Sequence, residues 1–495
     1  MKHDKIRDLG IALAQLNLVS PNYNKINYEY QYAVKRKIDL LILPDSTFSN
    51  KQDIEAFAAK TASQRTATIA GGRGKILVIY QGTTQEKEFA QQHRYISAEI
   101  NNLRLLILAD ILQTEICGAE RKYDFVISLQ NIPHIKASSA VKLKAAQEIS
   151  RKLKTPLIHL NKLDIQEELI FGGHSFIISG AGKLVADISE WQEKTINTKW
   201  QYQENKYELI SEVSLSKPYS KEESVYQALM MGLRSYAKKH GFKSAVLGLS
   251  GGIDSALTLA VAADAIGKDR VYAVLMPSLY TKESSIQDAK KYAENLEIEH
   301  SIVPIDKIFS STKESLGSIF ADMPEDITEE NMQARIRGMI LMSISNKFGH
   351  LMLCTGNKSE IAVGYCTLYG DTCGGYAPIA DLYKTEVYKL SNWRNQNVPF
   401  SGLINQTDII PESIISRAPS AELKPNQQDQ DDLPPYSELD KILQSLIEEQ
   451  KAPDKLPNYD KITVAKIVSL WEKAAFKRHQ LPPTIKIPKI LMSKK

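Results

Sequence analysis

Short apolar runs alternate with longer stretches of helical character between residues 10 and 190. The runs are rich in Val, Ile and Leu and have the length of β-strands. They read GIALAQL, DLLILPD, KILVIY, RLLILAD, DFVISLQ and PLIHLN. Strands that alternate with helices are typical of α/β folds. The pattern therefore predicts an α/β domain in the first part of the chain.

The pattern is interrupted at residues 214–229, where Ser, Lys and Pro precede a new series of apolar residues at helical spacing. This change predicts a domain boundary near residue 215, with domains at residues 1–215 and 216–495. The second domain repeats the alternation of strand and helix and includes the apolar run VYAVLMP. Such units predict a parallel sheet, whose ligands bind beyond the carboxyl ends of its strands.

Composition narrows the class of protein. The 495 residues are 43% hydrophobic and 24% charged, which is typical of a globular protein, and no apolar run has the length of a membrane span. A formal net charge of +4 is too small to indicate a nucleic-acid partner. The four cysteines show no Cys-x-x-Cys spacing, which argues against a zinc site and a disulfide framework. We therefore expect a cytoplasmic protein without a membrane or nucleic-acid partner.

The segment VLGLSGGIDSALTLA, at residues 246–260, has the form of a phosphate-binding loop. An apolar strand leads into a glycine turn and an apolar helix, so backbone N–H groups and the hydroxyls of Ser250 and Ser255 can bind an anion. The lysine of the common nucleotide loop is absent, and Asp254 lies in the first helical turn. A carboxylate beside phosphates indicates a bridging Mg²⁺ ion, and the alternative is an aspartate favoured only by the helix dipole.

The word SGGxDS resembles the loop of N-type ATP pyrophosphatases, which release pyrophosphate from ATP and transfer AMP. Three later segments, at residues 330–349, 353–390 and 419–425, resemble the signatures of NAD synthetases. The resemblance runs from about residue 220 to the end of the chain and implies a Rossmann-like parallel-sheet domain. It also implies amidation of deamido-NAD through an acyl adenylate, with ATP as co-substrate, Mg²⁺ as cofactor and ammonia as the attacking amine.

The resemblance also implies roles for individual residues. Residues expected to bind ATP are Gly248, Ser250, Gly251, Gly252, Asp254, Ser255, Thr355, Lys384 and Ser420. Residues expected to bind deamido-NAD are Arg335, Tyr369, Asp371 and Lys477. Asp254 and Glu360 are the expected metal ligands, and Glu360 follows a buried strand and a Thr-Gly turn, as a ligand of a parallel sheet should. Asp254, Lys384 and Asp371 are the expected catalytic residues, and Asp371 is the candidate to accept a proton from the amine.

Either of two arginines could contact a phosphate of the substrate. Arg335 and Arg337 are two residues apart on a predicted helix, so they cannot share one face. One of them reaches a substrate phosphate and the other makes a structural ion pair, and Arg335 is the residue assigned to the substrate.

The first domain resembles the nitrilase-like glutaminase of NAD synthetases, an α/β sandwich whose catalytic set is a Glu, a Lys and a Cys. Here Asp45 stands where the family has Glu, and Leu108 stands where it has Cys. The segment that should carry the Lys is short and contains only Lys87. We therefore expect a degenerate glutaminase domain attached to an ammonia-dependent synthetase. The alternative is a glutamine-dependent enzyme in which Cys117, Lys87 and Asp45 form a displaced triad.

Two further expectations concern partners. The resemblance implies a homo-oligomer built on a dimer of synthetase domains. A tRNA-modifying ligase that uses the same loop is the alternative function, with Cys366 and Cys373 as its paired cysteines and the basic carboxyl-terminal tail as its contact with RNA.

Overall fold

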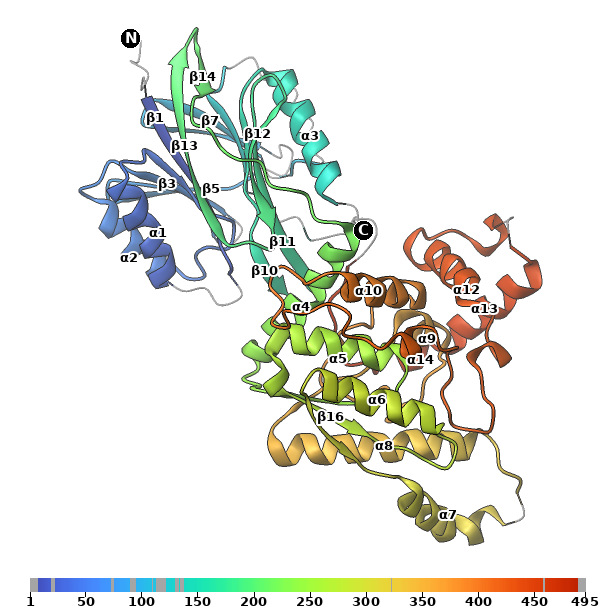
Figure 1. Ribbon diagram of the computed structural model, residues 1–495. Coiled ribbons are helices and arrows are strands. Elements are labelled where there is room, and N and C mark those ends of the chain that lie inside the picture. The colour runs from blue at the N-terminus through green and yellow to red at the C-terminus, as the bar shows by residue number, and fades with distance from the viewer. Residues whose placement is uncertain are drawn as a thin grey trace. The chain divides into compact units, whose positions relative to one another are not determined.

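The computed structural model describes residues 8–18, 23–72, 75–89, 95–108, 110–112, 122–129, 133, 138–321, 323–456 and 459–487. The chain divides into two compact units, residues 1–220 and residues 221–489, which we call the first and the second unit (Figure 1). The division between Ser220 and Lys221 falls within the polar segment in which the sequence placed a boundary.

The first unit contains two sheets of seven strands each, in the orders β14-β13-β1-β2-β3-β4-β5 and β10-β11-β9-β8-β7-β6, with β12 paired to β11. The first sheet consists of β1 (Asp8–Gln15), β2 (Leu40–Ile42), β3 (Ala67–Gly72), β4 (Lys75–Tyr80), β5 (Thr83–Lys87), β13 (Lys194–Gln203) and β14 (Lys206–Leu209). The second consists of β6 (Tyr95–Ile100), β7 (Leu103–Leu108), β8 (Phe125–Ser128), β9 (Leu157–His159), β10 (Leu163–Gln166), β11 (Leu169–Ile178) and β12 (Leu184–Glu190). The helices are α1 (Tyr23–Lys35), α2 (Lys51–Thr61) and α3 (Ser138–Leu153).

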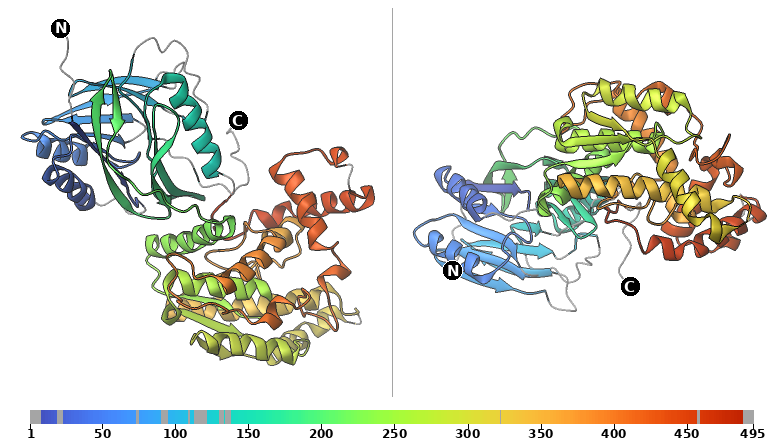
Figure 2. Two further views of the ribbon diagram at one scale, coloured as in Figure 1. Left: turned by 45° about the horizontal axis from the view of Figure 1, so that its top comes forward. Right: turned by 90° about the horizontal axis from the view of Figure 1, so that it is seen from below.

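Strand β1 of the first unit contributes side chains to two cores. Along β1, Leu9, Ile11 and Leu13 belong to the core between the sheets, whereas Ala12 and Ala14 belong to the core beneath α1 and α2. This division follows from the strand period of two residues, which sends successive side chains to opposite faces. The two sheets therefore pack face to face with helices on their outer faces, as Figure 2 shows. The predicted α/β sandwich is confirmed.

Three basic side chains are buried close together in the first unit. Lys142 of α3 is 3% exposed and His159 of β9 is fully buried. The Nδ1 atom of His159 lies 3.1 Å from the Oγ atom of Ser128. The rings of His159 and His174 lie 4.8 and 5.5 Å from the ring of Phe176. These contacts place imidazole and amine groups in surroundings that disfavour their charged forms.

Burial lowers the pKa of all three groups. The pKa of Lys142 falls to about 8, although the Glu190 carboxylate opposes the shift. Burial, assisted by the Lys142 ammonium and opposed by Asp187, lowers the pKa of His174 to about 4. Burial also lowers the pKa of His159 well below its ordinary value. The nearby Lys142 and His174 lower it further.

The first unit is therefore expected to lose stability as the pH falls from about 6.5 towards 4. The unfolded chain takes up protons at the ordinary histidine pKa, whereas folded His174 takes one up only near pH 4, so acid favours the unfolded state. The shifted pKa of His174 alone lowers the free energy of unfolding by about 2 kcal/mol at pH 5, relative to its value above pH 6.5. Hydrogen exchange of β9 and β11 in the intact protein, corrected for intrinsic rates, measures it. His174→Gln should show a smaller acid effect, and equal protection of β9 and β11 at pH 7 and pH 5 would contradict the prediction.

The second unit is built on a parallel sheet of four strands in the order β17-β16-β15-β18. The strands are β15 (Ala245–Gly248), β16 (Val271–Leu275), β17 (Glu299–Ile302) and β18 (Leu351–Met352). The chain adds β16 and β17 on one side of β15 and β18 on the other, so the order reverses at β15. Ligands of open parallel sheets bind at such a reversal, beyond the carboxyl ends of the strands. The predicted Rossmann-like domain is confirmed.

The second unit also contains helices, some on this sheet and others away from it (Figure 1). They are α4 (Lys221–Lys239), α5 (Ile253–Ile266), α6 (Glu283–Asn295), α7 (Asp306–Phe320), α8 (Ile327–Phe348), α9 (Lys358–Val363), α10 (Lys384–Gln396), α11 (Glu412–Ile415), α12 (Tyr436–Leu443), α13 (Lys461–Lys473) and α14 (Ala475–Arg478). The part of the chain that the structure describes contains no helix long and apolar enough to cross a membrane.

Candidate active site

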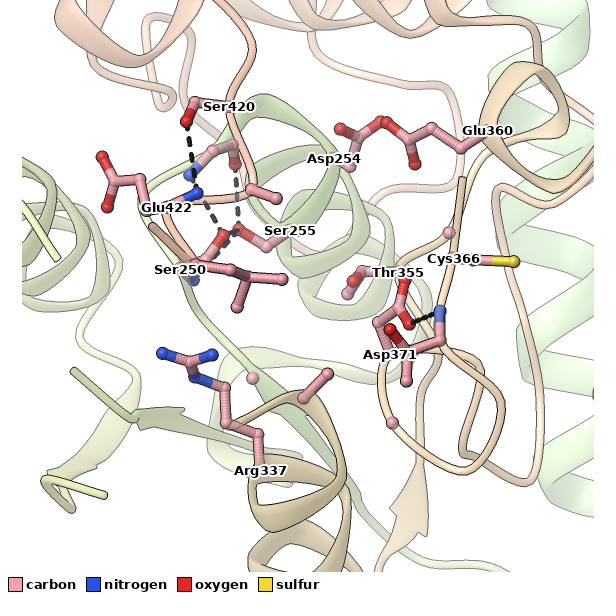
Figure 3. Close-up of a pocket in the computed structure, with 18 of the residues that line it drawn as sticks. Ser250, Asp254, Ser255, Arg337, Thr355, Glu360, Cys366, Asp371, Ser420 and Glu422 are labelled. Carbon is pink, nitrogen blue, oxygen red and sulfur yellow. Dashed lines mark hydrogen bonds between the residues drawn. The ribbon is translucent and has the colours of Figure 1, made fainter. Parts of the chain in front are cut away.

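A cavity of about 680 Å³ opens at the carboxyl ends of the strands of the second unit. Its walls are formed by the loop after β15, the residues after β16, the segment that follows β18, one face of α8 and residues of the segment 417–432 (Figure 3). The cavity lies where the strand order reverses, which is the expected ligand position of this fold.

The predicted phosphate loop forms one wall of the cavity. Gly251 has a φ of +80°, and a Cβ atom there would lie 2.4 Å from the carbonyl oxygen of Ser285, so only glycine fits. The hydroxyls of Ser250 and Ser255 lie 3.1 Å apart, and the N–H of Gly252 donates to the Ser250 hydroxyl. Helix α5 begins at the next residue and directs its electropositive end at the cavity. This wall can bind phosphate oxygens.

Two carboxylates and one ammonium meet beside this loop. The Nζ atom of Lys384 lies 2.5 Å from Oδ2 of Asp254 and 2.8 Å from Oε1 of Glu360. Figure 3 shows the two carboxylates directed toward one another, although they come from different helices. Burial alone would lower the pKa of Lys384, but the two carboxylates outweigh it and raise that pKa well above its ordinary value. The lysine is therefore an ammonium ion in this site.

Asn357, which was not among the predicted site residues, bonds to the carboxylate of Asp254 and to the backbone of Glu360. It is fully buried at the amino-terminal cap of α9. Its Oδ1 atom accepts the N–H of Glu360 at 3.1 Å, and its Nδ2 atom donates to Oδ1 of Asp254 at 2.9 Å. The sequence does contain a signal for this cap, because an Asn three residues before a Glu is a common start of a helix.

Replacing Asn357 by alanine should lower both stability and turnover. Loss of the cap costs about 1 kcal/mol, and loss of a group that orients ligands typically lowers activity about 10- to 100-fold. Asn357→Asp separates the two contacts, because it keeps the cap acceptor but replaces the donor to Asp254 with a second buried negative charge. We expect the aspartate variant to lose stability and turnover through repulsion between the two carboxylates, although the cap is retained. An alanine variant with parental turnover would contradict the positioning role.

The site fits a magnesium ion that arrives with phosphates. Among the residues that the structure describes, no group of three or more His, Cys, Asp or Glu side chains could hold a metal ion. Mg²⁺ commonly uses only one or two protein carboxylates together with the phosphates of its substrate. Asp254 and Glu360 approach a single nitrogen atom within hydrogen-bonding distance, so they can serve one cation.

The opposite wall of the cavity carries Asp371. Its Oδ1 atom accepts the N–H of Thr367 at 2.6 Å, and desolvation within the cavity raises the pKa of its carboxyl to about 6, although the residue as a whole is exposed. The Nζ atom of Lys477 donates to the carbonyl oxygens of Gly364 and Cys366 at 2.7 and 2.6 Å. Both side chains line the cavity. A carboxylate with this pKa is mostly ionised at neutral pH and can accept a proton.

The structure does not bring Arg335 and Tyr369 to the cavity. Helix α8 turns residues 334, 337, 338 and 341 toward it, at the spacing of one helical face, and Arg335 lies off that face. The Nε atom of Arg335 instead donates to the carbonyl of Leu368, and the hydroxyl of Tyr369 donates to Gln480. Arg337, in contrast, lines the cavity, and burial lowers its pKa to about 10.

The remaining predicted residues line the cavity. Those assigned to ATP and found there are Gly248, Ser250, Gly251, Gly252, Asp254, Ser255, Thr355, Lys384 and Ser420. Ser420 sits on a loop closed by its own hydroxyl, which donates to the carbonyl of Gln427 at 2.6 Å. Glu422 of the same loop accepts the Ser285 hydroxyl at 2.7 Å, a contact that the sequence did not suggest.

The predicted glutaminase positions can be located in the first unit. Leu108 ends β7 and packs with Leu106 and Val126 in the core beneath α3, so this position provides no nucleophile. Asp45 follows Pro44 at the end of β2, and burial raises the pKa of its carboxyl. Cys117 lies outside the described residues.

A lysine other than Lys87 interacts electrostatically with Asp45. Lys162 is fully buried, and its positive charge opposes the rise in the pKa of Asp45. Its Nζ atom lies 2.7 Å from Oδ2 of Asp164 and 3.5 Å from Oγ of Ser46. Lys162 was not among the predicted residues, because the family carries its lysine in a segment between two other strands.

Comparison with known proteins identifies relatives of the whole chain. Residues 225–481 match the NAD synthase family. The chain is 39% identical over 407 residues to the glutamine-dependent NAD(+) synthetase of Acinetobacter baylyi, an alignment that covers 81% of this chain and 73% of the relative. It is 41% identical over 366 residues to the Synechocystis enzyme of that name, covering 74% and 64%. The chain thus spans about two thirds of the length of these relatives.

Two solved structures resemble the whole chain. The glutamine-dependent NAD+ synthetase of Acinetobacter baumannii, in complex with ADP, is 30% identical with a TM-score of 0.75, covering 98% of this chain and 97% of that one. The corresponding enzyme of Cytophaga hutchinsonii has a TM-score of 0.78 at 18% identity, covering 98% and 95%, and supports the fold alone. The fold of the chain is therefore that of these enzymes.

These relatives correct the prediction of an ammonia-dependent enzyme with a degenerate glutaminase. Proteins 37 to 41% identical to the chain carry the name glutamine-dependent NAD(+) synthetase. The prediction relied on the residues at Asp45 and Leu108 and on a missing lysine. Such absences are weak evidence, because the fold brings Lys162 to Asp45 from a distant part of the sequence. The expectation of ammonia dependence was wrong.

Proposed function

The chain belongs to the NAD synthase family, and on this premise we propose that it amidates deamido-NAD to NAD with ATP and with glutamine as the nitrogen donor. The observation that carries the proposal is the cavity of the second unit, in which a phosphate loop, a carboxylate pair and Asp371 face one space. The names of the relatives support glutamine as the donor.

The carboxyl end of deamido-NAD must be activated before an amine can displace oxygen from it. A carboxylate is a poor electrophile, and transfer of AMP from ATP converts one of its oxygens into part of a good leaving group. The loop of Ser250 and Ser255 would hold the departing pyrophosphate through hydroxyls and backbone N–H groups. Ammonia then attacks the acyl adenylate and releases AMP.

Asp254 and Glu360 would hold Mg²⁺, which when bound neutralises charge on the phosphates and the leaving pyrophosphate. Asp371 would accept a proton from the attacking amine, in keeping with a pKa raised to about 6. Arg337 and Lys477 would contact the dinucleotide, since both line the cavity. The first unit would release ammonia from glutamine with a nucleophile other than residue 108.

The stoichiometry of ATP cleavage tests the proposed chemistry. We expect one AMP and one pyrophosphate for each NAD formed, measured by ion-exchange chromatography. ADP and orthophosphate as products would contradict an acyl adenylate. A tRNA-modifying ligase is not favoured, because burial raises the pKa of both Cys366 and Cys373 and so disfavours their reactive thiolates.

We also infer that the protein acts in the cytoplasm as a homo-oligomer built on a dimer. The resemblance to NAD synthetases, which implies a dimer of synthetase domains, supports this inference. Light scattering at micromolar concentration should give at least twice the mass of one chain. The mass of a single chain would contradict it.

A further inference from the structure

We propose that the ammonium of Lys384 is a built-in counter-cation, which holds the metal position of the nucleotide-free enzyme until Mg²⁺ enters together with ATP. The inference rests on the proposed function, because it concerns the metal of that reaction. It assigns Lys384 two successive places, first between the carboxylates and then on the phosphates.

The ammonium of Lys384 lies between the two carboxylates, where a metal ion bound to both would lie. Its Nζ atom is bonded to Asp254 at 2.5 Å and to Glu360 at 2.8 Å, and its side chain is 4% exposed. The second oxygen of Asp254 is already bonded to Asn357. A cation that binds both carboxylates must therefore displace the ammonium or lie against it.

The surroundings of Lys384 fix its backbone, whereas its ammonium is held only by interactions with charged and aromatic side chains. Its backbone N–H donates to the Ser359 hydroxyl at 2.8 Å, which anchors the start of α10. Its ammonium lies 5.2 Å from the centre of the Tyr436 ring, and the carboxylate of Asp429 adds a further negative charge. The four-carbon stem of a lysine can move the ammonium by several ångströms about a fixed backbone. A shift toward the cavity is therefore possible without a change of fold.

Electrostatics favour the binding of metal and nucleotide together over the binding of the metal alone. Two partly buried carboxylates this close together are unfavourable without a cation, so the lysine stabilises the empty site. A divalent ion alone would have to expel the ammonium and leave it without a partner. The phosphates of ATP offer the ammonium a new partner, so metal and nucleotide together overcome a barrier that the metal alone does not. Free metal should therefore bind weakly.

Binding of Mn²⁺ to the nucleotide-free protein, followed by electron paramagnetic resonance, tests the proposal without any turnover. The parent protein should bind Mn²⁺ only in the millimolar range. Lys384→Gln and Lys384→Met should bind it at least about tenfold more tightly, since they free both carboxylates. Adding Asp254→Asn to either variant should abolish the gain. Lys424→Met is the matched control, because Lys424 lines the cavity but pairs with Glu330 at 3.5 Å.

Each outcome decides the question. Tight Mn²⁺ binding by the parent protein without nucleotide overturns the proposal, and this result needs no variant to fold. Equal affinity of the parent and the Lys384 variants also overturns it, as does an equal gain in Lys424→Met, which would show a general charge effect. Loss of NAD synthesis in a separate assay would refute the proposed function and leave the Mn²⁺ result standing, so the two failures are distinguishable.

Discussion

Replacing Asp254 with asparagine is expected to lower NAD formation at least about 10²- to 10³-fold, the loss typical of removing one preorganised electrostatic contact. Asparagine keeps the size of the side chain and one oxygen, but it removes the charge that faces Glu360 and Lys384. The phosphate loop would remain formed, because Gly251 and the serine hydroxyls do not depend on this carboxylate. Steady-state rates at saturating ATP and Mg²⁺ measure the effect.

Asp269 provides the control for this substitution. It is exposed just beyond the far end of α5, the helix on which Asp254 lies. Asp269→Asn should leave the rate and the melting temperature unchanged. Turnover of Asp254→Asn within a few-fold of the parent would remove Asp254 from the reaction and with it the assignment of the metal position.

Replacing Asp371 with asparagine is expected to separate the two chemical steps. Adenylation needs the phosphate wall, whereas amidation needs a proton acceptor near the acyl group, and loss of such a group costs about 10²- to 10⁴-fold. Exchange of labelled pyrophosphate into ATP, dependent on deamido-NAD, should persist in the variant while NAD formation falls. In the parent protein the amidation rate should decline as the pH drops below about 6, because Asp371 then becomes protonated.

The contrary result for Asp371 is equally clear. Asparagine can still accept the Thr367 N–H that holds the loop, so the site should keep its shape. If pyrophosphate exchange and NAD formation fell together, Asp371 would act in substrate binding and not in the attack of the amine.

The phosphate loop and its partners could be predicted because short sequence motifs specify them. A strand, a glycine turn and a helix start define the place of Asp254, and a second strand and turn define that of Glu360. Since both follow strands of one parallel sheet, the fold brings them together. The ion pair that joins them through Lys384 spans 130 and 24 residues of sequence, and no local pattern announces it.

What could not be predicted from sequence has equally physical causes. The face of α8 shows which of the two arginines lines the cavity, whereas a helical period does not say which face meets a cavity. In the first unit the family spacing pointed to Lys87 on the edge strand β5, whereas Lys162 reaches Asp45 from the segment before β10. Contacts between distant segments depend on how the sheets pack, and a list of missing residues does not reveal them.

The most direct test of the proposed function uses glutamine labelled with ¹⁵N at its amide. The purified protein would be incubated with deamido-NAD, ATP, Mg²⁺ and this glutamine, and the NAD analysed by mass spectrometry. The account predicts NAD that carries the label in its carboxamide, formed together with AMP and glutamate, even when unlabelled ammonium is present at low concentration. Unlabelled NAD formed only from added ammonium, or no NAD at all, would contradict it.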